Sequence, residues 1–285
     1  MTRLTLIRRL AFGGSENDWN GFLHDYWGPI CRFALRQGAR NLDDAEDVAS
    51  KTFEVLWQNR LLSRWICEPR AKLRTLLCQV VRNILANQRR VWSGRDRFWH
   101  AVAEEAGLAV PAKPGENEGP DPFYSAWVED LIQRAVESLA GEYYRQDRGD
   151  YVRVLYGRLC ERLTTARVAE TLEIAPFAVD NYYRHVRRRL SEKLEELVRR
   201  HVARYAEPED VAEQFDQEWG QLGEHLARHG GLEEAICRTY ESLDAVCSLN
   251  RRKAALTRAA TRLTAIIRSS AEVNRRPHLD EPGVP

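Results

Sequence analysis

The polar side chains between residues 180 and 188 are of the types that bind nucleic acid. The amide of Asn181 can donate to and accept from a base edge, and the guanidinium groups of Arg184 and Arg188 can hold phosphate oxygens. The candidate contacts are Asp180, Asn181, Arg184, His185, Arg187 and Arg188. Base-edge and phosphate contacts from one stretch predict a DNA-binding surface, which binds without making or breaking covalent bonds.

Two short helices joined by a tight turn are expected to position these side chains. Residues 164–190, TTARVAETLEIAPFAVDNYYRHVRRRL, have the pattern of a helix-turn-helix. Pro176 suits the first position of the second helix, since it has no N–H to satisfy there. An apolar stripe along the second helix leaves its polar residues on the other faces. The stripe consists of Val179, Tyr183, Val186 and Leu190.

Two residues of this motif depart from the usual pattern. Glu173 occupies the turn position where glycine usually supplies a positive φ, and Ala175 occupies the N-cap without a side-chain oxygen. An ordinary amphipathic helix pair would also produce this pattern. The rest of the chain has to decide between the two interpretations.

Charge is segregated along the chain, although the formal net charge is only +1 over 285 residues. Residues 60–97 contain many arginines and only Glu68 and Asp96 as acids, and further basic runs cover residues 184–204 and 251–276. The length allows two or three domains. The basic runs suit a polyanionic partner despite the balanced total.

The sequence offers no constellation for catalysis or metal binding. Its 6 cysteines show no C-x-x-C pairing, its 7 histidines are scattered, and neither a G-x-S-x-G motif nor a phosphate loop occurs. We therefore expect no catalytic residue, metal or cofactor, and an enzyme is the least favoured class. Without an apolar signal region or a membrane-spanning run, the chain is expected to be cytoplasmic and to have no membrane partner.

Helical periodicity dominates and predicts an all-α protein. Helices are expected at residues 17–37, 43–58, 72–92, 125–139, 150–163, 165–172, 176–203, 208–228, 232–247 and 250–271. Residues 61–70 are expected to form a loop, and residues 107–122, GLAVPAKPGENEGPDP, a flexible linker. The predicted organisation is a first domain (1–98), a linker (99–124), a helix-turn-helix domain (125–204) and a helical extension with a disordered tail (205–285).

The first domain has an acidic helix start ahead of the most basic stretch of the chain. Asp43 and Glu46 have the spacing of a capping box, and Asp44 and Asp47 add negative charge at the positive end of the helix dipole. Capping accounts for Asp43 and Glu46. It does not explain why so acidic a helix start precedes the most basic stretch of the chain.

The following helix places Asn83 and Asn87 one turn apart on an exposed face, beside Arg82, Arg89 and Arg90. Amides can pair with base edges while arginines hold phosphates. A solvated polar face is the alternative interpretation. The residues expected to face inward are Leu73, Leu76, Leu77, Val80, Ile84 and Val91.

In this order, the segments resemble an extracytoplasmic-function (ECF) sigma factor, the two-domain class of bacterial subunits that direct RNA polymerase to promoters. DAEDVASKTFEVLWQ is similar to the helix that docks on the clamp helices of the polymerase beta-prime subunit, and LRTLLCQVVRNILANQRR to the helix that engages the −10 element. Residues 125–197 resemble the region that contains the −35-binding helix-turn-helix. WNGFLHDYW and FYSAWVEDLIQRAVESL look closest to groups abundant in Planctomycetes, often encoded near Ser/Thr kinases. The resemblance covers residues 19–204.

The resemblance implies a sigma factor that binds core RNA polymerase, through the beta-prime clamp helices and the beta flap, and recognises promoter DNA. The implied core-binding residues are Asp44, Glu46, Asp47, Val48, Lys51 and Glu54. The implied −10 contacts are Arg64, Arg74, Asn83, Asn87, Arg89 and Arg90. The −35 contacts are the six polar residues of the second helix named above. An anti-sigma factor is one further candidate partner, and a Ser/Thr kinase acting on Thr52, Ser63 or Thr75 is another.

The chain departs from the family in its second helix. Family members commonly carry Lys or Arg followed by Ser where this chain has Asp180 and Asn181, and Arg where it has His185. Since an acid is repelled by phosphate and can accept from a cytosine amine, we expect an unusual −35 element. Leu76 also replaces a frequent tryptophan in the −10 helix.

Beyond residue 204 the resemblance fades. Apolar residues of the last predicted helix lie near heptad spacing at Leu249, Leu256, Leu263 and Ile267. A hairpin packed on the helix-turn-helix domain, a regulatory arm that masks a DNA-binding face and an extra polymerase contact all fit this extension. For the whole chain, the alternative function is a helix-turn-helix regulator that binds duplex DNA without polymerase.

Overall fold

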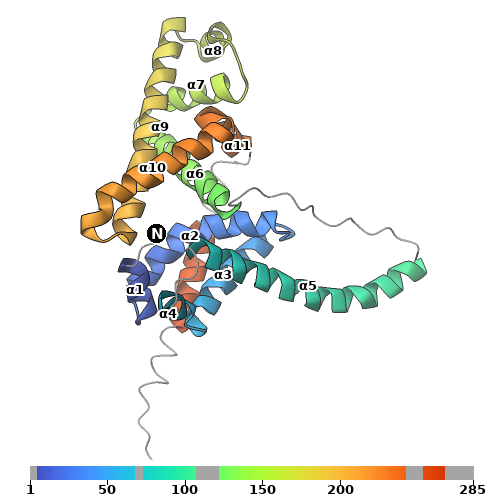
Figure 1. The fold of residues 1–285 in the computed structure, drawn as a ribbon. Helices are drawn as coiled ribbons and strands as arrows, with labels where there is room; N and C mark the ends of the chain where they lie inside the picture. Colours follow the sequence, from blue (N-terminus) through green and yellow to red (C-terminus); the bar gives the residue numbers. More distant parts are fainter. Residues whose placement is uncertain (1–4, 68–72, 107–121, 242–252, 267–285) are drawn as a thin grey trace, which may run out of the picture.

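Every regular element that the structure describes is a helix (Figure 1). The computed structural model describes residues 5–67, 73–106, 122–241 and 253–266, with side chains throughout except at 5, 67, 90–106, 240 and 241. No strand occurs within these ranges. The predicted all-α class is therefore confirmed for this part of the chain.

The helices follow one another in the order of Figure 1. They are α1 (Thr5–Ala11), α2 (Glu16–Arg36), α3 (Leu42–Gln58), α4 (Leu61–Cys67), α5 (Leu73–Ala106), α6 (Pro122–Arg145), α7 (Gly149–Leu159), α8 (Thr165–Leu172), α9 (Pro176–Tyr205), the 3-10 turn η1 (Pro208–Asp210), α10 (Val211–Arg228) and α11 (Gly231–Glu241). Residues 253–266 form a further helix, here named the C-terminal helix.

The helix boundaries differ from the prediction in two informative places. Where a loop was predicted over residues 61–70, α4 forms, because Leu62 is buried in the core and Trp65 packs against it. α5 runs to Ala106, through residues assigned to the linker, and Gly107 is the next residue that favours a helix end. The remainder of the predicted linker up to residue 121, and the tail beyond residue 266, lie outside the described residues.

The predicted capping box of Asp43 and Glu46 is wrong. α3 begins earlier, at Leu42, because Asn41 is as good an N-cap as Asp43. The Asn41 side chain accepts from the backbone N–H of Asp44 at 2.9 Å. The Asp44 carboxylate in turn accepts from the backbone N–H of Arg40 at 2.9 Å.

α2 carries large apolar side chains over most of its surface and packs within the bundle α1–α5, with Asn17, Asn20 and His24 on its exposed side. Towards α3, the rings of Phe22 and Trp27 lie 5.6 and 6.4 Å from that of Phe53. Towards α6, Tyr26 stacks on Phe123 at 6.4 Å. A helix with so wide an apolar surface has to be covered on more than one side. α2 therefore packs against both α3 and α6.

A second core lies between α6, α7, α9, α10 and α11, and a smaller one holds α8 against α9. The second core includes Leu131, Ala135, Leu155, Leu190, Val198 and Ile236. The small core consists of Val154, Val168, Ala169 and Val179. The predicted stripe of the second helix is confirmed, with Val179, Val186 and Leu190 buried and Tyr183 half-buried.

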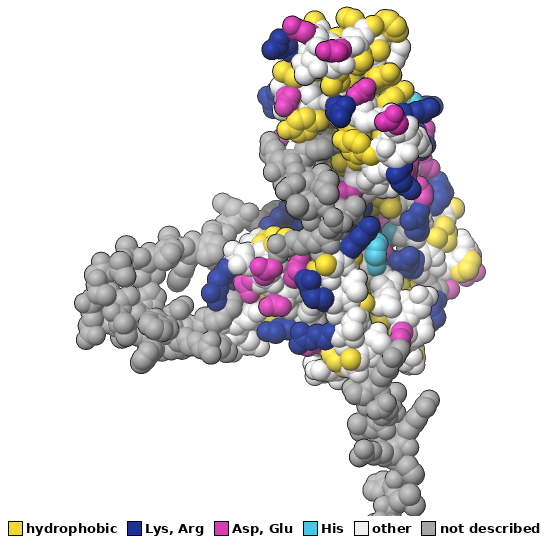
Figure 2. All heavy atoms as spheres, turned by 180° about the vertical axis from the view of Figure 1, so that it is seen from behind, with side chains coloured by type: hydrophobic (Ala, Val, Ile, Leu, Met, Phe, Trp, Pro, Cys, Tyr) yellow, Lys and Arg dark blue, Asp and Glu magenta, His cyan; other side chains and the backbone are white. Residues whose placement is uncertain are grey.

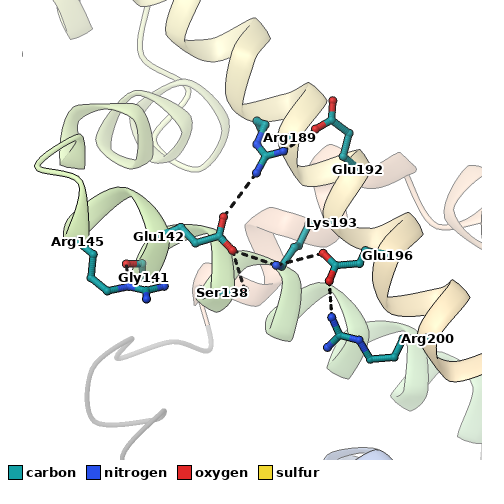
Figure 3. Close-up of polar contacts among 9 residues, drawn as sticks. All are labelled: Ser138, Gly141, Glu142, Arg145, Arg189, Glu192, Lys193, Glu196 and Arg200. Carbon is teal, nitrogen blue, oxygen red and sulfur yellow. Dashed lines mark hydrogen bonds and ion pairs between the residues drawn. The ribbon is translucent and has the colours of Figure 1, made fainter. Parts of the chain in front are cut away.

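Ion pairs join α6 to α9 beside this core (Figure 3). Glu142 of α6 accepts from Nζ of Lys193 at 2.9 Å and lies 3.6 Å from Arg189. Lys193 also contacts Glu196 at 3.3 Å. The hydrogen bond from Lys193 lowers the pKa of Glu142, so this carboxylate stays charged at neutral pH. The pairs add to the packing of Leu190, Leu194 and Val198 in the core, which sets the rotation of α9 and so decides which of its residues face away from α6.

A buried carboxylate joins α2 to the end of α9. Asp25 is 7% exposed, and its Oδ2 accepts from Arg204 at 2.7 Å and from the Tyr205 hydroxyl at 2.9 Å. At the far end of α2, Arg36 lies 2.5 Å from Glu129 of α6. Since a buried carboxylate without partners would be destabilising, α2 and α9 have to meet for Asp25 to be tolerated.

His201 makes this junction sensitive to acid. Its ring packs on Tyr26 and Trp127. Burial lowers its pKa from 6.5 to about 4. The negative charge of Asp25 acts in the opposite direction, and the positive charges of Arg134, Arg204 and Arg74 lower the pKa further. Between these two pH values, His201 is therefore protonated in the unfolded chain and neutral in the folded protein. The free energy of unfolding should fall as pH drops from 6.5 to about 4 and change little above 6.5 on account of this group.

Replacing His201 by Phe, which keeps the ring contacts, should remove that part of the pH dependence. Urea denaturation across this pH range measures it. His225→Phe is the comparison variant. Burial also lowers the pKa of His225, which packs on Tyr124, to about 4, so this variant should remove a separate part of the pH dependence and leave the part due to His201 in place. An identical pH profile in wild type and His201→Phe would contradict the assignment.

Candidate nucleic-acid and partner interface

α8 and α9 form the predicted helix-turn-helix, at the end of α9 away from α1–α5 (Figure 1). Thr164 caps α8 by accepting from the N–H of Arg167 at 3.3 Å. Both unusual residues behave as their positions predict: Glu173 is left-handed with φ 55°, and Ala175 caps α9 without a side-chain hydrogen bond. Pro176 begins α9 as expected.

The exposed start of α9 carries Asp180, Asn181 and Arg184. Asp180 accepts from the hydroxyl of Thr165 at 3.2 Å, so it also ties α8 to α9. Arg184 donates to the side chain of Asn181 at 2.7 Å and to the carbonyl of Asp180 at 3.3 Å. These three residues form one polar group at the outer end of the helix-turn-helix.

The other three predicted −35 residues lie further along α9. His185 is half-buried beside the rings of Tyr143 and Tyr151, where burial, followed by Arg188, lowers its pKa. It therefore belongs to the aromatic packing rather than to the free face. Arg188 is exposed, 3.8 Å from Glu192.

Arg187 is engaged by the extension that follows α9. Its guanidinium lies 3.0 Å from Glu233 of α11, which also accepts from the Tyr183 hydroxyl at 3.2 Å. One acid of α11 thus neutralises a predicted DNA contact.

Sequence reasoning missed Phe177, which is 72% exposed in the first turn of α9. The available signal was its place outside the apolar stripe of that helix, where a large aromatic side chain has nothing to pack against. An exposed aromatic ring next to Asp180 and Asn181 can contact the methyl group of a thymine.

α5 exposes Asn83 and Asn87 one turn apart, as predicted. Arg74, predicted to act with them, lies elsewhere: its guanidinium stacks on the ring of Tyr124 in α6 at 4.7 Å. Positions 74 and 83 are nine residues apart, and at about 100° per residue the two side chains leave the helix on opposite sides.

The arginines beside the two asparagines hold the end of α2. Arg82 donates to the side chain of Gln37 at 3.0 Å, and Arg89 donates to its backbone carbonyl. Cations at a helix C-terminus complement its dipole, so both have a structural role as well. Arg64 is exposed on α4, and the side chain of Arg90 lies outside the described residues.

The predicted polymerase-docking residues of α3 divide into three sets. Asp47 and Lys51 are exposed. Val48 is 0% exposed and belongs to the core, so its side chain offers no docking surface. Asp44 takes part in the cap, and Glu46 and Glu54 form ion pairs with the C-terminal helix.

Two hollows accompany these surfaces. An apolar groove of about 310 Å³ beside the helix-turn-helix is lined by Tyr144, Val152, Tyr156, Leu163 and Leu172, among others. A larger cavity of about 590 Å³ lies between α2, α6 and α9, and its lining includes Arg134, Arg145, Arg200, Arg204 and Lys253. Figure 2 shows basic side chains and a histidine at the junction of the two parts of the molecule.

Among the described side chains, no group of three or more His, Cys, Asp or Glu could hold a metal ion. Cys31, Cys78, Cys160 and Cys237 are free thiols. In the same ranges, no helix is long and apolar enough to cross a membrane.

The three hydroxyls considered for phosphorylation differ in access. Thr52 is 0% exposed and donates to the carbonyl of Val48 at 2.8 Å. Ser63 is half-buried and donates to the carbonyl of Ala11. Only Thr75 is exposed, so it is the one of the three that a kinase could reach without a change in structure.

Comparison of the chain with protein-family models, curated proteins and solved structures finds no match in any of the three. The geometry of the chain itself therefore has to support any function assigned to it.

The left-handed Glu173 provides a direct test of the turn. Glu173→Gly should stabilise the protein by about 1 kcal/mol, because glycine adopts positive φ without a Cβ clash. Glu173→Ala is the control, since it removes the same carboxylate but keeps the Cβ. Urea denaturation followed by circular dichroism compares them. Equal changes in the two variants would show that φ at this position is not the cause.

Proposed function

We propose that this protein is a sigma factor of the ECF type, which binds core RNA polymerase and directs it to promoters. The observation that carries the proposal is the presence of two separate polar surfaces, Asn83 and Asn87 on α5 and the start of α9 in the helix-turn-helix. A regulator that binds only duplex DNA would need the second surface and would have no use for the first.

Each surface suits a different state of DNA. The exposed amides of Asn83 and Asn87 can hydrogen-bond to unstacked bases of a melted −10 element, and Arg64 adds positive charge on neighbouring α4. The start of α9 can enter the major groove of the −35 duplex, where Asn181 reads base edges and Arg188 binds phosphate. Tethering both sites in one chain raises their effective affinity for a promoter.

The polymerase would be bound by both parts of the chain. Asp47 and Lys51 present exposed charges on α3 for the clamp helices of the beta-prime subunit. The apolar groove beside the helix-turn-helix, lined in part by Tyr144, Tyr156 and Leu172, would accept the beta flap. All of the bond-making chemistry belongs to the polymerase.

Run-off transcription on a genomic library, with purified core polymerase and this chain, tests the proposal. Initiation from a defined set of promoters only when both are present is the expected result. Failure to bind core, together with tight binding of the chain alone to specific duplexes, would favour the helix-turn-helix regulator instead.

The division of roles between α5 and α3 is testable with paired variants. Asn83→Ala with Asn87→Ala should leave core binding unchanged and reduce promoter opening by about tenfold or more, because two base-binding amides are lost. Opening is measured by permanganate reactivity of unpaired thymines. A pre-melted template should largely restore transcription, since the cost of unstacking is then already met.

Two controls separate this effect from general damage. Gln217→Ala with Gln221→Ala removes exposed amides with the same spacing from α10 and should change nothing. Asp47→Arg should show the reverse pattern, with weaker core binding and normal opening by whatever complex remains. Equal losses of binding and opening in both test variants would contradict the assignment.

Phe177→Ala should weaken binding to −35 duplexes about threefold to tenfold, because an apolar contact with a thymine methyl is lost. The measurement is fluorescence anisotropy with assembled holoenzyme on duplexes that carry thymine or uracil at single positions. At the contacted position, uracil should reduce wild-type binding and have no effect on the variant. Phe12→Ala removes an equally exposed phenylalanine just after α1, away from the helix-turn-helix, and is the control. An undiminished uracil effect in Phe177→Ala would rule out this contact.

A further inference from the structure

The C-terminal helix, residues 253–266, buries its apolar side chains in the first bundle, and its Lys253 and Leu256 also line the cavity beside α2, α6 and α9. Ala255, Ala259 and Leu263 are buried in the core that includes α2, α3 and α5, and Leu256 packs against it. Small residues at 255 and 259 allow the helix to approach closely, while Leu263 supplies a larger anchor. The docking is therefore a specific apolar contact.

Two ion pairs place this helix against α3. Arg258 lies 3.4 Å from Glu46, and Arg262 lies 2.7 Å from Glu54. The two glutamate side chains are only 12% and 17% exposed, whereas both arginines are more than half exposed. In both ion pairs the glutamate of α3 is therefore more buried than the arginine of the C-terminal helix.

Glu46 and Glu54 are two of the residues that the resemblance to ECF sigma factors implies for core binding, and they lie on the same helix as Asp47 and Lys51, which the proposed function assigns to core polymerase. From this overlap we infer that the C-terminal helix competes with core polymerase for the same face of α3, as a regulatory device within the chain. The inference rests on the proposed function. Asp47 and Lys51 stay exposed, so a partner can begin to bind before the helix leaves.

The contact is weak enough to be reversible. Ion pairs with exposed arginines contribute little to stability, and Leu263 is the only large one of the three buried side chains Ala255, Ala259 and Leu263. When a protein binds its partner only in a minor open state, its apparent affinity is reduced by the fraction of that state. Releasing the helix should therefore tighten core binding without any new contact to core.

Arg258→Glu with Arg262→Glu, in the full chain, should release the helix by placing acids opposite Glu46 and Glu54. Hydrogen–deuterium exchange of residues 253–266 should become faster, and the Kd for core polymerase should fall about tenfold. Thr257→Glu with Thr261→Glu is the control. It adds two acids to the exposed side of the same helix, at threonines whose hydroxyls donate to the backbone of that helix, and leaves both arginines in place. It should leave both exchange and Kd near wild type.

Leu263→Ala provides a second route to release through the apolar anchor, so the test does not depend on charge alone. It should also speed exchange and tighten core binding. A released helix with an unchanged Kd for core, in either variant, would overturn the inference while leaving the proposed function intact. Absence of core binding in wild type and in every released variant would overturn the proposed function, and the inference with it.

Discussion

The burial of the wide apolar surface of α2 is the constraint on which the arrangement of the molecule depends. Phe22 and Trp27 are covered by α3, whereas Tyr26 and Phe33 need α6, through Phe123. The bundle α1–α5 therefore cannot complete its core without the first helix of the part that carries the helix-turn-helix. Asp25 also requires this junction, because the hydrogen bonds that satisfy its buried charge come from Arg204 and Tyr205 at the end of α9.

This junction leaves most of the proposed DNA surfaces free, while the extension after α9 covers one DNA contact of the helix-turn-helix and part of the polymerase-docking face of α3. Asn83, Asn87 and Phe177 remain exposed, but Glu233 of α11 holds Arg187 and the C-terminal helix holds Glu46 and Glu54. Of the three interpretations of the extension, packing on the helix-turn-helix domain describes α10 and α11. The last helix returns to the first bundle, so the extension links surfaces far apart in the sequence.

Periodicity was enough to predict most of the helices, though not α1 or α4, because long apolar stripes such as the one containing Val179, Val186 and Leu190 have to be buried in any fold. The helix-turn-helix was predictable down to its strained turn at Glu173, since local geometry alone requires a positive φ there. What the sequence could not provide were long-range partners. Arg74 was grouped with Asn83 by proximity in the chain, yet it meets Tyr124 across the junction. The contacts of Arg258 and Arg262 with α3 likewise depend on a return of the chain that no local pattern encodes.

The central claim is that this chain opens promoter DNA only as part of RNA polymerase. Permanganate footprinting on a promoter selected by run-off transcription tests it, with the chain alone, core alone and the two together. The claim predicts reactive thymines at the −10 element, and protection at the −35 element, only when both are present. Protection of the same duplex by the chain alone, with no melting when core is added, would contradict it.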